Sequence, residues 1–356
     1  MPDSAAQAFG GNRDRSFSGE IGAFYQSQDL FRQRYRVLRA LGQGGFGVTY
    51  LAQDVNLPGQ PYCVIKQLAP RARNDLALDR AKVRFRREAK ALANLGSHSQ
   101  IPQLLDYFTL SGEFYLVQEY IQGQTIAQEV RQQGRQTEAQ VKYFLQEMIP
   151  VLQFIHRNRI IHRDIKPPNI IRCEFDRRLV LIDFGAVREC LTDLNDAYTC
   201  QAPVSQFVGT PGFAPPEQLS LRPCYGSDIY ALGMTCLYML TGRTPSEFDG
   251  DAKTGRVRWR HTVTVSNFFA GILDKMLRPD PTERYTSIDA LLRDLALEPH
   301  LDSLTQCLTT TPSPPPSVDT HPVASSPQYL TAVQRQAQAI RAWRNRRLDR
   351  AISQTR

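Results

Sequence analysis

The sequence has no long apolar segment and no closely spaced cysteine pair. No run of about 18 apolar residues occurs in its 356 residues, so we expect no membrane-spanning helix. It begins Met1-Pro2-Asp3-Ser4, without the basic and apolar regions of a secretory signal. The seven cysteines are odd in number and form no C-x-x-C pair, which argues against a disulfide framework or a zinc ribbon. We therefore expect a cytoplasmic protein with reduced thiols.

An excess of basic residues is confined to one end of the chain. Forty-three Lys and Arg against 35 Asp and Glu give a formal net charge of +8. Residues 328–356 contain seven arginines and one aspartate, so +6 of this charge lies there and residues 1–327 are nearly neutral. The charge is thus a property of a tail, and no nucleic-acid-binding module accompanies it. We expect no nucleic acid as a partner.

The first third of the chain predicts a polar arm followed by a small β-rich unit. Residues 1–34 are rich in Gly, Ser and Gln, which is typical of a disordered arm. One helix with apolar residues at helical spacing is expected over Asp79–Leu95. Five strand-like runs surround it: Tyr35–Leu41, Val48–Ala52, Tyr62–Leu68, Leu104–Thr109 and Phe114–Tyr120.

After Gly123 the pattern becomes helical. Thr137 and Gln140 form a capping-box pattern before an apolar stripe that ends at Ile155. Further helices are expected over Ser227–Leu240, Asn267–Leu277 and Ser287–Leu295. Residues 301–327 are rich in Pro, Ser and Thr and are interpreted as a linker, because such a composition cannot form a packed core. Residues 328–356 could form a basic helix.

Three short patterns are ambiguous when each is taken alone. Residues Gly42 to Gly47 read G-Q-G-G-F-G, which fits either a hairpin turn or a loop whose backbone N–H groups cover phosphates. A dinucleotide-binding fold needs a helix after the glycines, and the strand-like run that follows argues against it. Lys66 and Glu88 could each be a solvated surface charge.

A fourth pattern is decisive. Residues 162–169 read H-R-D-I-K-P-P-N, and residues 183–185 read D-F-G after the apolar run Leu179–Ile182. The eight fixed letters of these motifs would recur by chance on the order of 10⁻¹⁰ per position. An ordinary polar loop beside a buried strand therefore does not explain why both motifs occur in this order.

With these motifs the sequence resembles the eukaryotic-like serine/threonine protein kinases of bacteria. The runs G-G-F-G-V-T-Y at 44–50 and G-F-A-P-P-E-Q at 212–218 are most similar to the cyanobacterial branch. The resemblance covers about three quarters of the chain, residues 35–297. It implies an α+β bilobal protein-kinase fold, with a β-rich N-lobe at 35–121 and a mainly helical C-lobe at 122–300.

The resemblance also implies transfer of the γ-phosphate of Mg·ATP to Ser or Thr hydroxyls of protein substrates, in signalling and with autophosphorylation. Asp164 would orient the hydroxyl and accept its proton, and Lys166 would steady the γ-phosphate. Lys66, paired with Glu88, would bind the α- and β-phosphates. Asn169 and Asp183 would ligate Mg²⁺, with Mn²⁺ as a substitute. The ATP pocket would comprise Leu41, Gly42, Gln43, Gly44, Gly45, Phe46, Gly47, Val48, Thr49, Val64, Lys66, Gln118, Glu119, Ile121 and Ile171.

Other family residues have counterparts here. Thr210 would hydrogen-bond the catalytic Asp and Lys, Glu217 would pair with Arg284, and Asp228 would hold the catalytic-loop backbone. The hydrophobic column that joins the lobes would consist of Leu92, Leu104, His162 and Phe184.

The sequence alone leaves the regulation of the kinase open. The hydroxyls of Thr192, Tyr198, Thr199 and Ser205 fall between the D-F-G and P-P-E motifs. Ser205 or Thr199 could be autophosphorylated, with Arg84 and Arg188 converging on Arg163 to receive the phosphate, or all four could be ordinary loop hydroxyls. The basic tail could bind a partner or an anionic surface, or serve only as a solvated segment.

The sequence allows two alternatives to an active kinase. A pseudokinase scaffold commonly lacks the counterparts of Lys66, Asp164 or Asp183, all of which this chain has. In the second alternative the tail is the main functional element and the kinase domain controls it.

Overall fold

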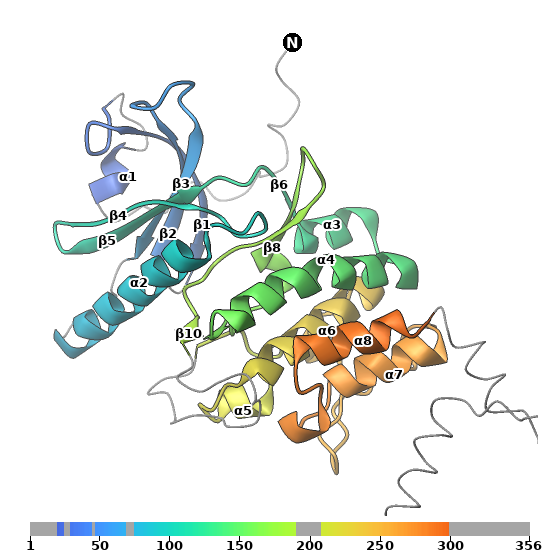
Figure 1. Cartoon of the computed structure of the whole chain (residues 1–356). Helices are drawn as coiled ribbons and strands as arrows, with labels where there is room; N and C mark the ends of the chain where they lie inside the picture. The colour runs from blue at the N-terminus through green and yellow to red at the C-terminus, as the bar shows by residue number, and fades with distance from the viewer. Residues whose placement is uncertain (1–19, 25–28, 45–46, 69–74, 190–207, 299–356) are drawn as a thin grey trace, which may run out of the picture. The chain divides into compact units, whose positions relative to one another are not determined.

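A β-rich lobe and a helical lobe follow one another along the chain (Figure 1). The computed structural model describes residues 20–24, 29–44, 47–68, 75–189 and 208–298. The first lobe contains an antiparallel five-stranded sheet in the order β1-β2-β3-β5-β4. Its strands are β1 (Tyr35–Gly44), β2 (Gly47–Asp54), β3 (Tyr62–Leu68), β4 (Leu104–Leu110) and β5 (Glu113–Glu119). The five predicted strands are confirmed.

The N-lobe sheet buries a different set of side chains on each face, because residues alternate along a strand. On β5, Phe114 and Leu116 pack in one cluster with Phe85 and Leu92 of helix α2 (Asp75–Leu95). Tyr115, from the same strand, packs in a second cluster on the other face. The predicted helix is confirmed and begins four residues earlier than expected.

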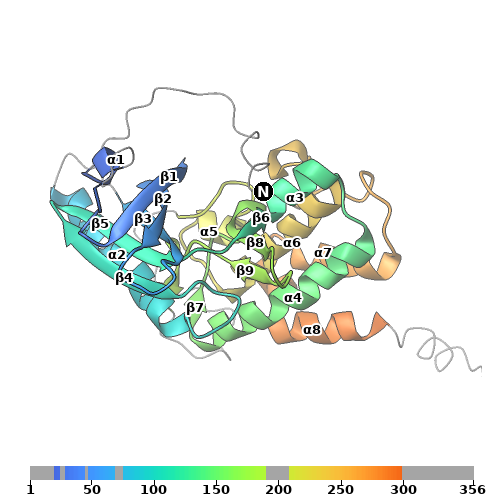
Figure 2. The same cartoon turned by 90° about the horizontal axis from the view of Figure 1, so that it is seen from above.

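The second face of the sheet is covered by residues that the sequence placed in a disordered arm. Ile21, in the short helix α1 (Glu20–Phe24), and Phe31 are both fully buried in the second cluster. Arg34 forms an ion pair with Asp54 at 2.7 Å. Figure 2 shows α1 beside β1 and β3, away from α2. The prediction of a disordered arm is therefore wrong for residues 20–24 and 29–34. Although this segment is mostly polar, its few apolar side chains are buried against the apolar second face of the sheet.

We expect Ile21→Ala to destabilise the N-lobe by about 2 kcal/mol, since it removes a fully buried side chain. Thermal unfolding should show a melting temperature lower by about 5 °C. Leu57→Ala is the control, because Leu57 is 43% exposed. Equal melting temperatures for the two variants would mean that α1 does not contribute to stability.

The C-lobe is built around two long helices, α4 (Glu138–Arg157) and α6 (Tyr225–Thr241). In α6 every residue except Tyr238 is buried. Thr137 caps α4 in the predicted capping box, with Gln140 reaching back to the Thr137 N–H. Helices α7 (Asn267–Met276) and α8 (Ile288–Ala296) are confirmed to within one residue at each end.

Short elements complete the C-lobe. The sequence did not predict helix α3 (Ile126–Gln133), which Thr125 and Gln128 begin with a second capping box. The remaining elements are β6 (Gly123–Thr125), β7 (Ile160–Ile161), β8 (Ile170–Cys173), β9 (Leu179–Leu181), β10 (Arg188–Glu189) and α5 (Pro216–Leu219), with single 3₁₀ turns at Pro167–Asn169, Pro245–Glu247 and Pro281–Glu283.

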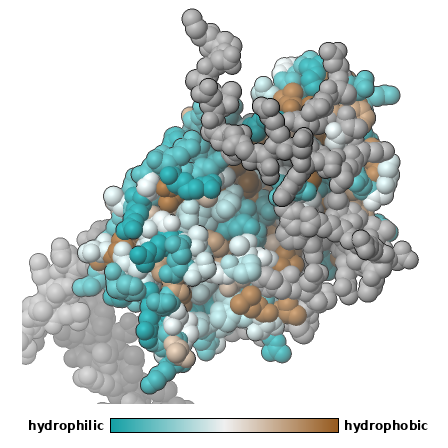
Figure 3. All heavy atoms as spheres, turned by 180° about the vertical axis from the view of Figure 1, so that it is seen from behind, coloured by the Kyte–Doolittle hydropathy of each residue, from teal (hydrophilic) through white to brown (hydrophobic). Residues whose placement is uncertain are grey.

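The described surface is mainly hydrophilic on the face in Figure 3, with hydrophobic side chains in separate small groups. None of the helices in the described part of the chain has both the length and the apolar character that a membrane crossing requires.

Candidate active site

Strands β1 and β2 bring the glycine motif to the end of the N-lobe sheet. Gln43 pairs with Val48 and Gly44 with Gly47 across the hairpin. At Gly47 φ is 143°, and a Cβ atom there would lie 1.8 Å from the Gln67 carbonyl oxygen. Only glycine fits this close approach of β2 to β3, which is the physical reason for the last glycine of the motif.

Lys66 links three elements by two ion pairs. On β3, its Nζ lies 2.7 Å from Glu88 Oε1 on α2 and 2.6 Å from Asp183 Oδ1 after β9. Lys66 pairs with Thr49 across β2 and β3, so the phosphate-binding candidate lies beside the glycine hairpin. A Cβ at Gly185 would come within 3.1 Å of Glu88 Oε2 and 3.2 Å of Lys66 Nζ, so the residue after Phe184 has to be small.

The charges of this cluster stabilise one another. Burial alone would lower the pKa of Lys66, but the Asp183 and Glu88 carboxylates raise it above its ordinary value. Burial would likewise raise the pKa of Asp183, but Lys66 outweighs this and lowers it to about 2. Lys66 and Asp183 are thus both ionised near neutral pH, as phosphate and metal binding require.

Asp164 is held by three neighbouring side chains. Thr210 Oγ1 donates to Asp164 Oδ1 at 2.7 Å, and Asn169 Nδ2 donates to Asp164 Oδ2 at 3.0 Å. Lys166 Nζ lies 2.9 Å from Asp164 Oδ2 and 2.7 Å from Thr210 Oγ1. The carboxylate is 5% exposed, so its orientation is fixed before any substrate arrives.

The backbone that carries Asp164 is anchored to α6 by a buried carboxylate. Asp228 accepts hydrogen bonds from the His162 N–H at 2.9 Å and the Arg163 N–H at 2.8 Å, and His156 Nε2 contacts it at 2.9 Å. Burial would raise the pKa of Asp228, but its hydrogen bond with His156 and the nearby donors lower it. Arg163 is in the left-handed region with φ 71°, and this anchoring holds the strained turn.

An apolar contact lies next to Asp183 in the sequence, at Phe184. The ring of Phe184 is buried and packs edge-on against His162, with centroids 4.9 Å apart. Leu92 and Phe184 belong to one core cluster, and Leu104 packs against it. The His162–Phe184 contact is thus formed, and the stacking of all four residues in one column stays a prediction. Asp183 has φ 67°, a second strained residue at this site.

The candidate adenine residues belong to two sheets, the five-stranded sheet of the N-lobe and the β6-β8-β9 sheet of the C-lobe. Val64 pairs with Gln118 across β3 and β5, Ile121 follows β5, and Ile171 on β8 packs beside Ile121. The Glu119 N–H already donates to the Gln103 carbonyl at 2.9 Å, so this amide is not available to a base. Leu41 and Gly42 are exposed at the end of β1.

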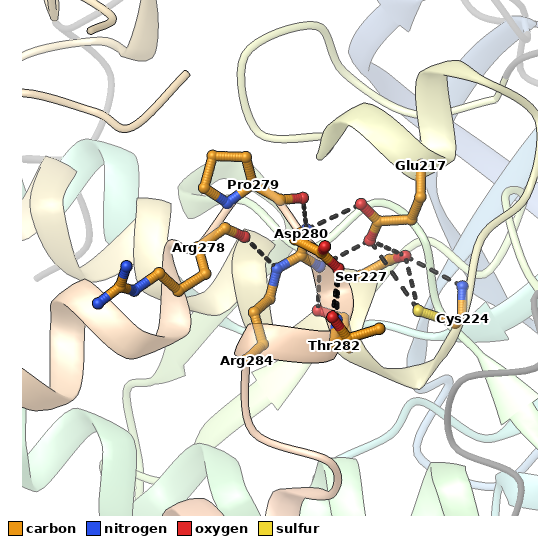
Figure 4. A network of polar contacts seen from close by, with 9 residues as sticks. Glu217, Cys224, Ser227, Arg278, Pro279, Asp280, Thr282 and Arg284 are labelled. Carbon is orange, nitrogen blue, oxygen red and sulfur yellow. Dashed lines mark hydrogen bonds and ion pairs between the residues drawn. The ribbon is translucent and has the colours of Figure 1, made fainter. Parts of the chain in front are cut away.

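A buried ion pair joins the P-P-E motif to the end of the C-lobe (Figure 4). Arg284 Nη1 and Nη2 donate to the two carboxylate oxygens of Glu217 at 2.6 and 2.8 Å, and the Arg284 side chain is fully buried. Ser227 Oγ donates to the same Glu217 oxygen as Nη1, at 2.7 Å. Next to Glu217, the Gln218 amide donates to the Arg163 carbonyl at 2.7 Å, which connects the ion pair to the catalytic loop.

The residues present fit a divalent cation. The amide nitrogen of Asn169 is occupied by Asp164, which leaves its Oδ1 oxygen for a ligand. Asp183 is ionised, and its side chain is 30% exposed. A carboxylate and an amide oxygen are the hard donors that Mg²⁺ and Mn²⁺ take in proteins.

Comparison with known proteins agrees with this geometry. A model of the protein kinase domain matches residues 35–295. The chain belongs to the protein kinase family. Its kinase domain is 48% identical over 281 residues to serine/threonine-protein kinase B of Synechocystis sp., an alignment that covers 78% of this chain and 49% of that protein. Serine/threonine-protein kinase PknA of Nostoc sp. is 43% identical over 274 residues, 76% of this chain and 48% of that protein.

A more distant relative is serine/threonine-protein kinase PrkC of Bacillus subtilis, 30% identical over 279 residues, which cover 74% of this chain and 40% of that protein. The predicted resemblance to cyanobacterial serine/threonine kinases and the bilobal kinase fold are confirmed. The chain spans about half the length of the first curated relatives that it matches.

Some predicted residues lie outside the described part of the kinase domain. They are Gly45 and Phe46 of the glycine motif, the two candidate phosphorylation sites Thr199 and Ser205 with the neighbouring hydroxyls, and the linker and basic tail at 301–356. The convergence of Arg84 and Arg188 on Arg163 also stays a prediction. Two site residues were not anticipated, His156 and Gln218. Gln218 belongs to the quoted P-P-E-Q run, but its contact with Arg163 depends on tertiary structure alone.

Proposed function

We propose that the chain is an active serine/threonine protein kinase, which transfers the γ-phosphate of Mg·ATP to Ser or Thr hydroxyls of proteins. The observation that carries the proposal is the group of Asp164, Lys166 and Thr210, oriented by hydrogen bonds on the same loop as Asn169. Lys66 and Asp183, paired at 2.6 Å, complete the proposed group. A pseudokinase scaffold does not transfer phosphate and would not require these charged side chains in this arrangement.

In the proposed reaction Asp164 accepts the proton of the Ser or Thr hydroxyl as that oxygen bonds to the γ-phosphorus and ADP leaves. Its Oδ1 accepts from Thr210, which orients the carboxylate to act as the proton acceptor. Lys166 stands next to it and offsets the charge of the transferred phosphoryl group. Lys66, kept cationic by Asp183 and Glu88, binds the α- and β-phosphates.

Asn169 Oδ1 and the Asp183 carboxylate would hold the divalent cation. When bound, Mg²⁺ neutralises phosphate charge and orients the nucleotide. The glycine hairpin would place backbone N–H groups over the phosphates, and the side chains of Val64 and Ile171 would contact the two faces of the purine.

The test is phosphorylation of casein by the full chain with labelled ATP and Mg²⁺. We expect label on phosphoserine and phosphothreonine after acid hydrolysis, and its loss when EDTA removes the metal. Label on tyrosine alone would contradict the proposed specificity. No label with either Mg²⁺ or Mn²⁺ would favour the scaffold.

The physiological substrate is a protein that carries Ser or Thr, and autophosphorylation between residues 183 and 217 stays part of the proposal. Phosphosite mapping after incubation with ATP decides it. A cytoplasmic location, a partner or anionic surface for residues 328–356 and the absence of nucleic-acid binding stay predictions.

A further inference from the structure

The strand that carries Lys66 also buries a polar side chain on its other face. Side chains alternate along β3, so that Leu68 packs in the first cluster and Ile65 in the second. Gln67 therefore lies on the second face of the sheet, opposite Lys66, and it is fully buried there. Because a buried amide is costly unless its donors and acceptor are hydrogen-bonded, the contacts of Gln67 need an explanation.

Gln67 joins the two strands on either side of β3. Its Nε2 donates to Glu113 Oε2 on β5 at 2.7 Å, and the Tyr50 hydroxyl on β2 contacts its Oε1 at 3.5 Å. The Tyr115 hydroxyl donates to the same Glu113 oxygen at 2.6 Å. Burial raises the pKa of Tyr50 to about 12, so this hydroxyl keeps its proton and can donate. These four residues form the β3 clamp.

The β3 clamp and the ion pairs of Lys66 hold adjacent residues of one strand from opposite faces. On the first face, Lys66 Nζ lies 2.7 Å from Glu88 and 2.6 Å from Asp183. On the second face, the Gln67 amide is bound to Glu113. Rotation of β3 about its axis would break one of these two sets of contacts. The direction of the Lys66 side chain therefore depends on Gln67 as well as on its own two carboxylates.

Gln67 also supports the glycine hairpin. Gly47 approaches it so closely that a Cβ atom there would lie 1.8 Å from the Gln67 carbonyl oxygen. Val48 pairs with Gln67 across β2 and β3, and Tyr50, two residues further along β2, contacts its side chain. A displacement of Gln67 would thus move Lys66 and the base of the hairpin together. The two groups proposed to bind the nucleotide phosphates share one support.

We propose that Gln67 and Glu113 are positioning residues for nucleotide binding, which act through Lys66 and the glycine hairpin from the face opposite Lys66. The inference rests on the proposed function, which assigns phosphate binding to those two groups. A glutamine that served only the packing of the sheet could be replaced by leucine with a loss of stability and none of affinity. A positioning residue could not, because a misplacement of about 1 Å at a functional group has a large effect.

The test measures the affinity of the full chain for the fluorescent nucleotide mant-ADP with Mg²⁺, a readout that requires no phosphate transfer. We expect Gln67→Leu and Glu113→Ala to weaken binding by about tenfold, and the milder Tyr115→Phe by about threefold. Glu113→Gln should bind within about twofold of the wild type, because its amide oxygen can still accept from Gln67 and Tyr115. Tyr35→Phe is the matched control for Tyr115→Phe. It removes a hydroxyl contact with Asp106 on the same face, at the end of β1 away from the hairpin, and should leave binding unchanged.

Wild-type affinity in Gln67→Leu would overturn the proposal. So would equal losses in Tyr35→Phe and Tyr115→Phe, since a general loosening of the sheet would then explain both. Thermal unfolding verifies that each variant is folded at the temperature of the titration. A chain that shows the expected pattern with mant-ADP and labels no casein would refute the kinase and leave the positioning role intact. A chain that labels casein and binds mant-ADP equally well with Gln67→Leu would refute the positioning role alone, and a wild type that binds no mant-ADP would refute both.

Discussion

Replacing Asp164 by asparagine should lower the rate of phosphate transfer by about a thousandfold. The substitution keeps the shape of the side chain and an oxygen that Thr210 Oγ1 can contact, but it removes the charge and the proton acceptor. ATP binding should not change, because Lys66, which would hold the phosphates, and Asp183, which would hold the metal ion, pair with each other and not with Asp164. The measurement is the initial rate of casein labelling, together with nucleotide binding by fluorescence.

Asp176→Asn is the control, since it is the same change in an exposed carboxylate paired with Arg178 on the turn between β8 and β9. It should retain the wild-type rate. If Asp164→Asn transferred phosphate as fast as Asp176→Asn, Asp164 would not be the base. A parallel loss of nucleotide binding would instead mean that the variant distorts the site.

Glu217→Ala should reduce the free energy of unfolding by about 3–5 kcal/mol. The substitution leaves the Arg284 guanidinium fully buried without its carboxylate partner. Carbonyl oxygens of Gly226 and Pro279 still accept from it, at 3.0 and 2.9 Å, but they do not offset its charge. Thermal unfolding should show a melting temperature lower by about 10 °C. Activity should fall as well, because Gln218 ties this segment to the Arg163 carbonyl.

The exposed ion pair between Glu283 and Arg278 provides a control for the Glu217→Ala variant. Glu283 is 53% exposed and pairs with Arg278 at 3.3 Å, so Glu283→Ala should cost less than about 1 kcal/mol. Similar melting temperatures for Glu217→Ala and Glu283→Ala would show that burial does not strengthen the Glu217–Arg284 pair.

Elements with a strong local pattern could be predicted from the sequence. The apolar stripe and capping box of α4 contain enough local information to define its start, and the strands of the N-lobe differ from their predicted bounds by at most three residues. The segment around Ile21 and Phe31 could not be recognised, because its stability comes from a sheet face that forms elsewhere in the chain. Helix α3 was missed for a related reason: its eight residues include only two apolar side chains besides Ala127.

The same distinction between local patterns and long-range contacts applies to the candidate site. The H-R-D-I-K-P-P-N motif places Asp164, Lys166 and Asn169 on one loop, so their proximity follows from the sequence. Lys66, Glu88 and Asp183 are separated by up to 117 residues, and only the resemblance to a family brought them together in advance. His156 carries no signal of its own, since a histidine near the end of a helix is common and its contact with Asp228 depends on the packing of α4 on α6.

The two ion pairs of Lys66 determine which inactive variant is the better reference in experiments on partners and localisation. Its ammonium group contacts one carboxylate on α2 and one that follows β9, so the same side chain also links the two lobes. A Lys66 variant would therefore change how the lobes are held together as well as the chemistry of the site. Asp164→Asn leaves that link in place, and it is the better inactive reference for measuring partners and localisation.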